Sequence, residues 1–372
     1  MLALYRKYRP HYFKDVIGQE HVVRTLTNAL LSGSISHAYL FCGPRGSGKT
    51  TIARLLAKAV NCEDKTSFEP CDKCSSCVEI SEGHSMDLVE IDAASNRGID
   101  DIKELREGIR YLPTKLKYKV FILDEAHQLS KDAANALLKT LEEPPSHAIF
   151  ILATTEAHKM IPTIVSRCQR FDFRKLTVPE ITKRLEIVVK NEKAKISHSA
   201  INLIAVNSGG SMRDGESLLN QAISFSQVNA KDKEVVADDI KDLLGLVEIQ
   251  VVGKLVEFII GKDQNQAIRY LGELIDKGTD VEQFIRALID YLRQGLIVKM
   301  TDENDYPTTI TSGLTKEEYQ LLVEQVKKLK ATELRKLTGA MIEAENKMRY
   351  ASITQLPLEL AIAEFCEITD KI

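Results

Sequence analysis

Five short segments rich in apolar residues recur through the first half of the chain. They lie at about 38–42, 87–91, 119–123, 148–153 and 170–173, and longer stretches with helical spacing separate them. Buried strands of a parallel sheet are short and apolar, and helices usually connect them. The pattern therefore predicts an α/β domain whose parallel sheet is covered by helices on both faces.

The strand pattern fades after about residue 174, and helical spacing replaces it. Ile181, Leu185 and Val188 fall on one helical face, and the chain reads as helical from about residue 245 onward. No nucleophile, metal cluster or glycine-rich loop stands out after residue 220, so these helices are expected to pack or to assemble. The expected domains are an α/β domain (1–177), a small helical domain (178–244) and an all-helical domain (245–372).

The first predicted strand leads into a glycine-rich loop. In "AYLFCGPRGSGKTT" (38–51), the pattern G-x4-G-K-T runs from Gly43 to Thr50, and the helical pattern "TIARLLAKAV" follows. Backbone N–H groups of such a loop wrap around phosphates, and the helix N-terminus adds its dipole. Lys49 is expected to reach the β and γ phosphates and Thr50 to bind Mg²⁺. An ordinary glycine turn explains the glycines but not the Lys-Thr pair. The expected nucleotide-binding residues of this loop are Gly43, Pro44, Arg45, Gly46, Ser47, Gly48, Lys49, Thr50 and Thr51.

A second apolar strand ends in two acids, in "KVFILDEAHQLS" (119–130). Asp124 would lie at the strand tip, where it can hold hydrated Mg²⁺, and Glu125 can orient and deprotonate an attacking water. An acidic strand end also occurs in proteins where it has no function. Together with the phosphate loop, however, this motif strongly predicts a site that hydrolyses a bound nucleotide.

Three more polar positions have both a functional and an ordinary interpretation. The strand "AIFILATT" (148–155) ends in Thr154 and Thr155, whose hydroxyls can read a γ-phosphate or position water, or can be a plain polar strand end. Arg167, in Ser-Arg-Cys, is either an arginine finger for phosphoryl transfer or a solvated charge. Arg213 lies at a predicted helix start, where a cation is unfavourable unless an anion is near. A solvent-facing arginine is the alternative for Arg213.

Four of the seven cysteines lie in "NCEDKTSFEPCDKCSSCVE" (61–79). Cys62, Cys71, Cys74 and Cys77 include two C-x2-C spacings, which aim pairs of thiolates at one ion. A reducing cytoplasm disfavours disulfides, and the polar neighbours disfavour four buried hydrophobic thiols. The segment at about 62–80 therefore predicts a structural zinc site inserted into the first domain, with no open position for catalysis.

Composition and charge narrow the class of protein. Of the 372 residues, 44% are hydrophobic and 28% are charged, which suits a soluble chain of two or three domains. The apolar runs are too short to span a bilayer, so we expect a cytoplasmic protein without a membrane partner. With 50 Lys plus Arg against 53 Asp plus Glu, the net charge is −3, so any nucleic acid must meet a local or assembled basic surface.

Taken together, these motifs resemble the gamma/tau subunits of bacterial DNA polymerase III, the AAA+ ATPases of the sliding-clamp loader. The resemblance covers essentially the whole chain. It is carried by "YRKYRPHYFKDVIGQEHV" (5–22), "GPRGSGKTT", the four cysteines, "EIDAASNRGIDDIKELRE", "LDEAH", "LLKTLEEPP", "ATTE" and "SRC". It implies an ATP hydrolase within the polymerase III holoenzyme, acting in DNA replication at the replisome and nucleoid, without a polymerase active site of its own.

The resemblance also assigns roles to single residues. Val16 and Ile17 would contact adenine, and Thr155 would be the sensor of the first domain. Arg213, in a helical lid domain, would contact the γ-phosphate of its own nucleotide. Arg167 would reach the ATP of a neighbouring subunit, in trans, so hydrolysis would need an oligomer. The last domain would form the collar of a five-subunit ring.

The partners implied by the resemblance are the delta and delta-prime subunits, further copies of this chain, the beta sliding clamp and primed DNA. The segment "SNRGIDDIKEL" (95–105) is the candidate DNA-contacting element, with Arg97 as the expected phosphate contact, although Asp100 and Asp101 do not favour DNA. The longer product of the family carries further domains for the helicase and the polymerase. This sequence stops at the collar, so those two partners are not assigned.

Two other function classes remain open from the sequence. The first is a nucleotide-binding assembly scaffold that never hydrolyses, which intact Lys49, Thr50, Asp124 and Glu125 disfavour. The second is a hexameric AAA+ DNA translocase or branch-migration motor, which would use the same core motifs. The four-cysteine insertion and the helical collar disfavour that motor.

Overall fold

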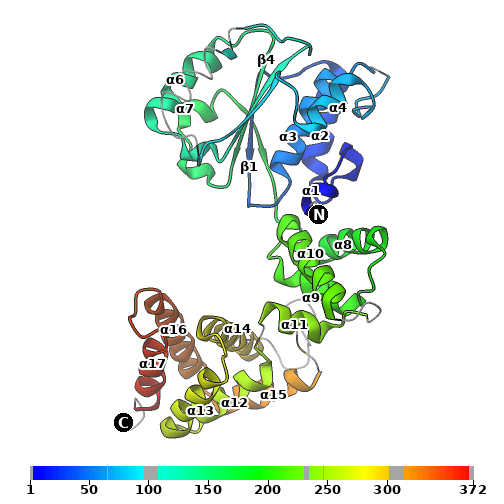
Figure 1. Ribbon diagram of the computed structural model, residues 1–372. Coiled ribbons are helices and arrows are strands. Elements are labelled where there is room, and N and C mark those ends of the chain that lie inside the picture. The colour runs from blue at the N-terminus through cyan, green and yellow to red at the C-terminus, as the bar shows by residue number, and fades with distance from the viewer. Residues whose placement is uncertain are drawn as a thin grey trace. The chain divides into compact units, whose positions relative to one another are not determined.

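The computed structural model describes residues 3–64, 66–95, 108–109, 111–229, 234–245, 247–300, 314 and 316–367. The chain divides into two compact units, Met1–Val236 and Ala237–Ile372, which are treated separately below (Figure 1). Within those described ranges, none of the helices is long and apolar enough to cross a membrane.

A five-stranded parallel sheet lies at the centre of the first unit, with strand order β2-β3-β4-β1-β5. The strands are β1 (Ala38–Cys42), β2 (Leu88–Asp92), β3 (Lys119–Asp124), β4 (Ala148–Thr154) and β5 (Gln169–Asp172). They coincide with the five predicted segments to within one residue at each end, so the predicted parallel sheet is confirmed. Because all strands are parallel, the polar residues that follow β1, β3 and β4 meet at one edge of the sheet.

Helices cover both faces of this sheet (Figure 1). Side chains alternate along β1, so that Tyr39 and Phe41 pack under α2 (Glu20–Ser32) and α3 (Lys49–Asn61). Leu40 points to the other face, where α6 (Lys131–Glu142) and α7 (Pro162–Val165) pack. Both faces are therefore apolar, as a sheet covered on two sides requires.

Short elements and a helical subdomain complete the first unit. The N-terminal part contains α1 (Leu4–Lys7) and the 3₁₀ turn η1 (Phe13–Asp15), and the cysteine-rich segment ends in α4 (Ser75–Glu82). Two further 3₁₀ turns, η2 (Ala126–Gln128) and η3 (Ala157–Lys159), follow β3 and β4. The helical subdomain consists of α8 (Val178–Glu192), α9 (His198–Asn207) and α10 (Met212–Asn229). A capping box between Thr177 and Glu180 starts α8.

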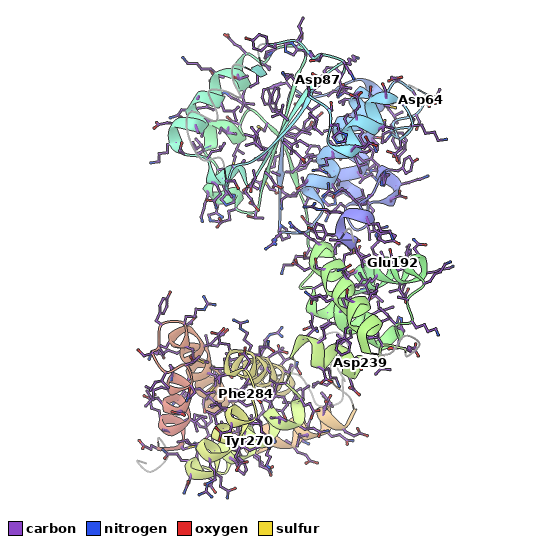
Figure 2. All side chains as sticks on the ribbon, in the orientation of Figure 1. Asp64, Asp87, Glu192, Asp239, Tyr270 and Phe284 are labelled. Atoms are coloured by element: carbon purple, nitrogen blue, oxygen red, sulfur yellow. The ribbon has the colours of Figure 1, made fainter. Side chains whose placement is uncertain are left out.

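The second unit is helical over its described residues, as the spacing predicted. Its helices are α11 (Ala237–Leu244), α12 (Ile249–Ile260), α13 (Gln264–Asp276), α14 (Val281–Met300), α15 (Lys316–Lys328), α16 (Ala331–Met348) and α17 (Leu356–Glu367). Figure 2 shows their side chains, among them Phe284, which is buried in a hydrophobic core. Buried Gln325 accepts from the hydroxyl of Tyr291 and donates to the carbonyl of Gly253, so the polar groups of these three residues are satisfied inside the core.

Candidate nucleotide site

Two glycines of the phosphate loop, Gly43 and Gly46, are required by close packing as well as by backbone conformation. Gly46 has a φ of 72°, and a Cβ there would lie 1.9 Å from Oγ of Ser211, just before α10. Gly43 has a φ of 153°, and a Cβ there would lie 2.5 Å from the carbonyl oxygen of Phe173. The loop is thus enclosed between the end of β5 and the start of α10, where a larger residue would clash.

Buried Gln19 fixes the loop to the same region. Its side chain donates to the carbonyls of Ser47 (3.3 Å) and Arg174 (2.8 Å), and it accepts from the N–H of Arg174 (3.2 Å). One amide therefore connects the phosphate loop to the segment that joins the sheet to the helical subdomain. Buried amides with this many partners hold their neighbours in one arrangement.

Lys49 and Thr50 begin α3 beside the tip of β3. The Lys49 ammonium donates to the carbonyls of Gly43 (2.8 Å) and Pro44 (2.9 Å). Burial lowers the pKa of Lys49, and the carboxylates of Glu125 and Asp124 oppose this shift. Oγ1 of Thr50 donates to Oδ2 of Asp124 at 2.9 Å. The hydroxyl and the carboxylate that the sequence assigned to one cation therefore lie in contact.

Glu125 is held in an uncommon backbone conformation at the end of β3, with a φ of 48°. One of its carboxylate oxygens accepts from the hydroxyl (2.9 Å) and the N–H (3.3 Å) of Thr155, which follows β4. The same oxygen lies 3.4 Å from Nδ1 of buried His127. The hydroxyl of buried Thr154 contacts this histidine rather than the pocket. Thr155 therefore contacts Glu125 but is not among the residues that line the cavity described below.

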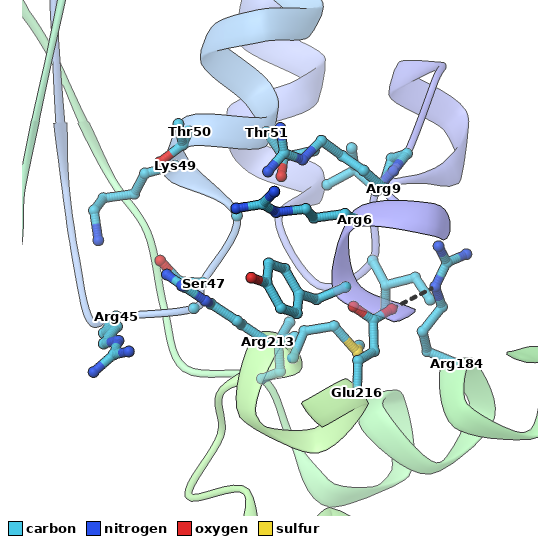
Figure 3. Close-up of a pocket in the computed structure, with 18 of the residues that line it drawn as sticks. Arg6, Arg9, Arg45, Ser47, Lys49, Thr50, Thr51, Arg184, Arg213 and Glu216 are labelled. Carbon is cyan, nitrogen blue, oxygen red and sulfur yellow. Dashed lines mark ion pairs between the residues drawn. The ribbon is translucent and has the colours of Figure 1, made fainter. Parts of the chain in front are cut away.

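A single cavity of about 400 Å³ brings most of the predicted residues together (Figure 3). Its wall includes the phosphate loop from Arg45 to Thr51, both acids that follow β3, and Arg213 from α10. Val16 and Ile17, assigned to the base, line it as well. In Figure 3, Arg213 points toward Ser47, whereas Arg45 points away from the other side chains.

The cavity also contains residues to which the sequence analysis gave no individual role. These are Tyr5, Arg6, Arg9, Arg184 and Glu216, together with apolar Pro10, Leu176 and Met212. Figure 3 shows Arg6 directed toward the phosphate loop and Glu216 paired with Arg184 on the side away from Lys49. The signal that could have found part of this set is the mixture of arginine and tyrosine in "YRKYRP", which is unusual for a plain surface turn.

The N-terminal segment is fixed to the helical subdomain. Glu192, at the end of α8, accepts from the Lys7 ammonium and the Tyr8 hydroxyl, each at 2.6 Å. Arg184 donates to the carbonyl of Tyr8. The Arg213 guanidinium lies 5.0 Å from the centre of the Tyr5 ring, within cation–π range. This segment therefore lines the cavity while resting on α8 and α10.

Arg167 lies outside the set of residues that line the cavity. Its guanidinium bonds Glu142 at the end of α6 (2.5 Å) and the carbonyl of Thr163 (2.8 Å), and its side chain is 32% exposed. The expected DNA contact, Arg97, lies outside the described residues.

The four cysteine sulfurs of the insertion lie within 4.8 Å of one another. Tetrahedral zinc with Zn–S bonds of about 2.3 Å places its sulfurs roughly 4 Å apart, so the cluster fits that ion. Backbone N–H groups already point at three of the sulfurs, those of Cys62, Cys71 and Cys74, at 3.3–3.5 Å. Such donors stabilise thiolates.

The insertion also contacts the N-terminal segment. Glu69 accepts from the backbone N–H groups of Phe13 (2.7 Å) and Lys14 (2.9 Å). Asp72 bonds both His11 and Lys58 of α3. The cysteine-rich segment therefore braces the chain just before Val16 and Ile17.

A parallel sheet with a phosphate loop, an acidic strand end and a helical lid whose arginine faces the same cavity defines a nucleotide-binding protein of the AAA+ class. Three family descriptions match consecutive parts of the chain. They are "DNA polymerase III, delta subunit" (residues 18–177), "DNA polymerase III clamp loader subunit, ATPase lid domain" (180–228) and "DNA polymerase III subunits gamma and tau domain III" (235–371).

Individual proteins agree with these matches. The tau subunit of DNA polymerase III from Bacillus subtilis is 42% identical over 98% of this chain and 63% of its own length. The gamma subunit from Buchnera aphidicola (subspecies Baizongia pistaciae) is 40% identical over 80% of this chain and 79% of its own. The chain belongs to the gamma/tau family of DNA polymerase III subunits, as the motifs indicated. It spans less than two thirds of the Bacillus relative.

Among solved structures, the RuvB Holliday junction branch migration motor of Thermotoga maritima is similar at a TM-score of 0.48. The sequence identity is 20%, and the match covers 71% of this chain and 85% of that one.

Proposed function

We propose that this chain is the ATPase subunit of the clamp loader of DNA polymerase III, which uses ATP binding and hydrolysis to open the sliding clamp and load it on primed DNA. The observation that carries the proposal is the single cavity lined by Lys49, Thr50, Asp124, Glu125 and Arg213. These side chains supply phosphate binding, cation binding, a general base and a fixed cation, which are the parts that ATP hydrolysis requires.

At the phosphate end, Lys49 exchanges the loop carbonyls that it now contacts for β- and γ-phosphate oxygens. The contact between Thr50 and Asp124 (2.9 Å) supplies the hard oxygen ligands that suit Mg²⁺. This ion neutralises phosphate charge when it is bound. Arg213 contacts the γ-phosphate from the lid side, and Val16 and Ile17 pack against adenine.

Glu125 orients and deprotonates the attacking water. Its hydrogen bond from the hydroxyl of Thr155 (2.9 Å) supports a sensor role for that threonine, because the bond sets where the carboxylate can point. Nδ1 of His127 lies 3.4 Å from the same carboxylate oxygen. Because Thr155 and His127 both approach this one oxygen, the carboxylate must be released or turned before it meets water, which gives the protein a point of control.

Arg167 acts in trans, on the ATP of a neighbouring subunit. Its position outside its own cavity and its partial exposure support this role. In this chain Glu142 neutralises the guanidinium, so docking of a neighbour's triphosphate replaces one acidic partner with another. Hydrolysis then depends on assembly.

Cys62, Cys71, Cys74 and Cys77 hold a structural zinc ion. The clustering of the four sulfurs supports this, and four protein ligands leave no open coordination position. Through Glu69, the zinc segment fixes the backbone of Phe13 and Lys14, so zinc stabilises the wall of the nucleotide cavity without taking part in the reaction.

The partners are those implied by the family. The domain bounds proposed are those expected from the sequence, whereas the domain III match begins at residue 235 and the second compact unit at Ala237. Residues 1–177 form the ATPase domain, 178–244 the lid, and 245–372 the collar that joins the delta and delta-prime subunits and further copies of this chain. The assembly acts on the beta sliding clamp and primed DNA in the cytoplasm. Arg97 contacts DNA phosphate.

Steady-state ATP hydrolysis tests the proposal. The chain is assayed alone and then with delta, delta-prime, sliding clamp and primed DNA. We expect clamp and primed DNA to stimulate hydrolysis strongly. Arg167→Ala should lose this stimulation, and the control Arg170→Ala should keep it. Arg170 is a nearby exposed arginine that pairs with Asp172 on β5. Equal hydrolysis in every mixture would reject the clamp-loader function while leaving the ATPase intact.

A further inference from the structure

The cavity contains a buried carboxylate that the hydrolysis steps do not use. Glu216 lies on α10, three residues after Arg213, and is 5% exposed. Because residues three apart share a helix face, Glu216 and Arg213 both face the cavity. Burying a carboxylate is costly unless its oxygens are hydrogen-bonded, so its position calls for a ligand or a strong protein partner.

The protein partner of Glu216 is weak. Nε of Arg184 lies 3.6 Å from its Oε1, which is longer than a hydrogen bond. The same guanidinium donates through another nitrogen to the carbonyl of Tyr8. The carboxylate therefore keeps acceptor capacity that Arg184 does not fill. In agreement, burial raises the pKa of Glu216 to about 7, although Arg184 and Arg9 act to lower it.

The position of Glu216 points to the base end of the nucleotide. In Figure 3 the Glu216–Arg184 pair lies apart from Lys49, with Arg213 between them. The phosphate loop holds the phosphates, so the base of a bound nucleotide extends away from Lys49. The apolar residues suited to a base line the same cavity: Pro10, Val16, Ile17, Leu176 and Met212.

Resting on the proposed ATPase function, we infer that Glu216 is a specificity-determining residue, whose carboxylate accepts a hydrogen bond from the exocyclic amine of adenine. An ionised carboxylate accepts but cannot donate. It therefore favours adenine, which presents an N–H donor at position 6, and disfavours hypoxanthine and guanine, which present a carbonyl oxygen there. A site that reads a polar group rejects the analogue that leaves its buried group unpaired.

Nucleotide binding by the full chain tests this inference. Calorimetric titrations with ADP and IDP, in the presence of Mg²⁺, compare the two bases without hydrolysis. They are run at about pH 8.5, where Glu216 is ionised because its pKa is about 7. The variants are Glu216→Gln, whose amide can also donate to a carbonyl oxygen, and Glu192→Gln. Glu192 is a matched control because this lid carboxylate bonds Lys7 and Tyr8 but does not line the cavity.

We expect the wild-type chain to prefer ADP, and Glu216→Gln to reduce the ratio of ADP to IDP affinity about tenfold, the value of one hydrogen bond. Glu192→Gln should keep the wild-type ratio. If Glu216→Gln weakens both nucleotides equally, the carboxylate only holds Arg184 and the inference is wrong. Absence of ADP binding by the wild-type chain would instead overturn the proposed ATPase function.

If Glu216→Gln does not fold, a modified nucleotide tests the inference on the wild-type chain. Purine riboside diphosphate has hydrogen in place of the amine at position 6. Wild-type affinity about tenfold below that for ADP agrees with a hydrogen bond at this position. Equal affinity for the two nucleotides overturns the inference.

Discussion

Because the carboxylate of Glu216 is buried, the free energy of unfolding of the first unit should fall as the pH rises. Most paired acids have the opposite effect. Burial raises the pKa of Glu216 from 4.5 to about 7, so between these values the folded chain binds a proton that the unfolded chain has released. The ionised form is therefore destabilising. The protonated form is fully favourable below about pH 4.5, and its contribution is lost as the pH rises through 7.

The size of the effect follows from the two pKa values. Because the pKa of Glu216 rises from 4.5 to about 7 on folding, the free energy of unfolding is about 3 kcal/mol lower at high pH than at low pH. Most of that interval lies above about pH 5.5. Between about pH 5.5 and 8.5 the wild-type chain should lose about 2 kcal/mol of unfolding free energy relative to Glu216→Gln, whose amide does not titrate.

Urea unfolding followed by circular dichroism measures this difference, since the chain contains no tryptophan to follow by fluorescence. The matched control is Glu180→Gln. Hydrogen bonds from Arg174 lower the pKa of Glu180 to about 2, so its stabilisation is lost only as the pH falls from 4.5 toward 2. The offset of this control from the wild-type chain should stay constant between about pH 5.5 and 8.5. A constant offset for Glu216→Gln as well would refute the reasoning about its burial.

Three further predictions concern the rest of the site. Lys49→Ala should abolish nucleotide binding and ATP hydrolysis, measured by calorimetry and phosphate release; retained binding would place the phosphates elsewhere. Thr155→Val should lower kcat about tenfold or more with unchanged ADP affinity, because Glu125 loses its hydroxyl donor at 2.9 Å; an unchanged kcat would remove Thr155 from the mechanism. Cys74→Ser should release zinc and lower both the unfolding midpoint and nucleotide affinity, since Glu69 then no longer braces Phe13 and Lys14; full stability after complete zinc removal would contradict the structural role.

The sequence predicted the parts of the site that lie on single continuous motifs. The phosphate loop and the acids after β3 each follow a strand, and parallel strands bring their ends to one edge, so Thr50 and Asp124 meet although 74 positions separate them. The sequence could not predict in this way that Tyr5, Arg6 and Glu216 line one cavity. This arrangement depends on how α1 packs on α10, and no local pattern reports a contact across that separation.

The burial of Glu216 could not be predicted from the local sequence pattern. In "MRDGESLLNQ" a glutamate between a glycine and a serine looks like a solvated helix residue. Its burial depends on Arg184 of α8 and on the N-terminal segment, neither of which is near in sequence. Likewise, the sequence indicated that Arg167 is either an arginine finger or a solvated charge. It did not indicate that Glu142 binds this arginine in the isolated chain.

The N-terminal segment connects the cysteine-rich insertion and the lid, two features for which the sequence predicted no contact. On one side, Glu69 of the cysteine-rich insertion fixes the backbone of Phe13 and Lys14, just before the predicted base contacts. On the other side, Glu192 of the lid fixes Lys7 and Tyr8. A rotation of the lid must therefore either pull on the wall of the cavity or break these contacts. Because the cysteine-rich insertion holds Phe13 and Lys14 in place, the second outcome is favoured, and lid rotation would break the bonds of Glu192 to Lys7 and Tyr8 beside the arginines that line the cavity.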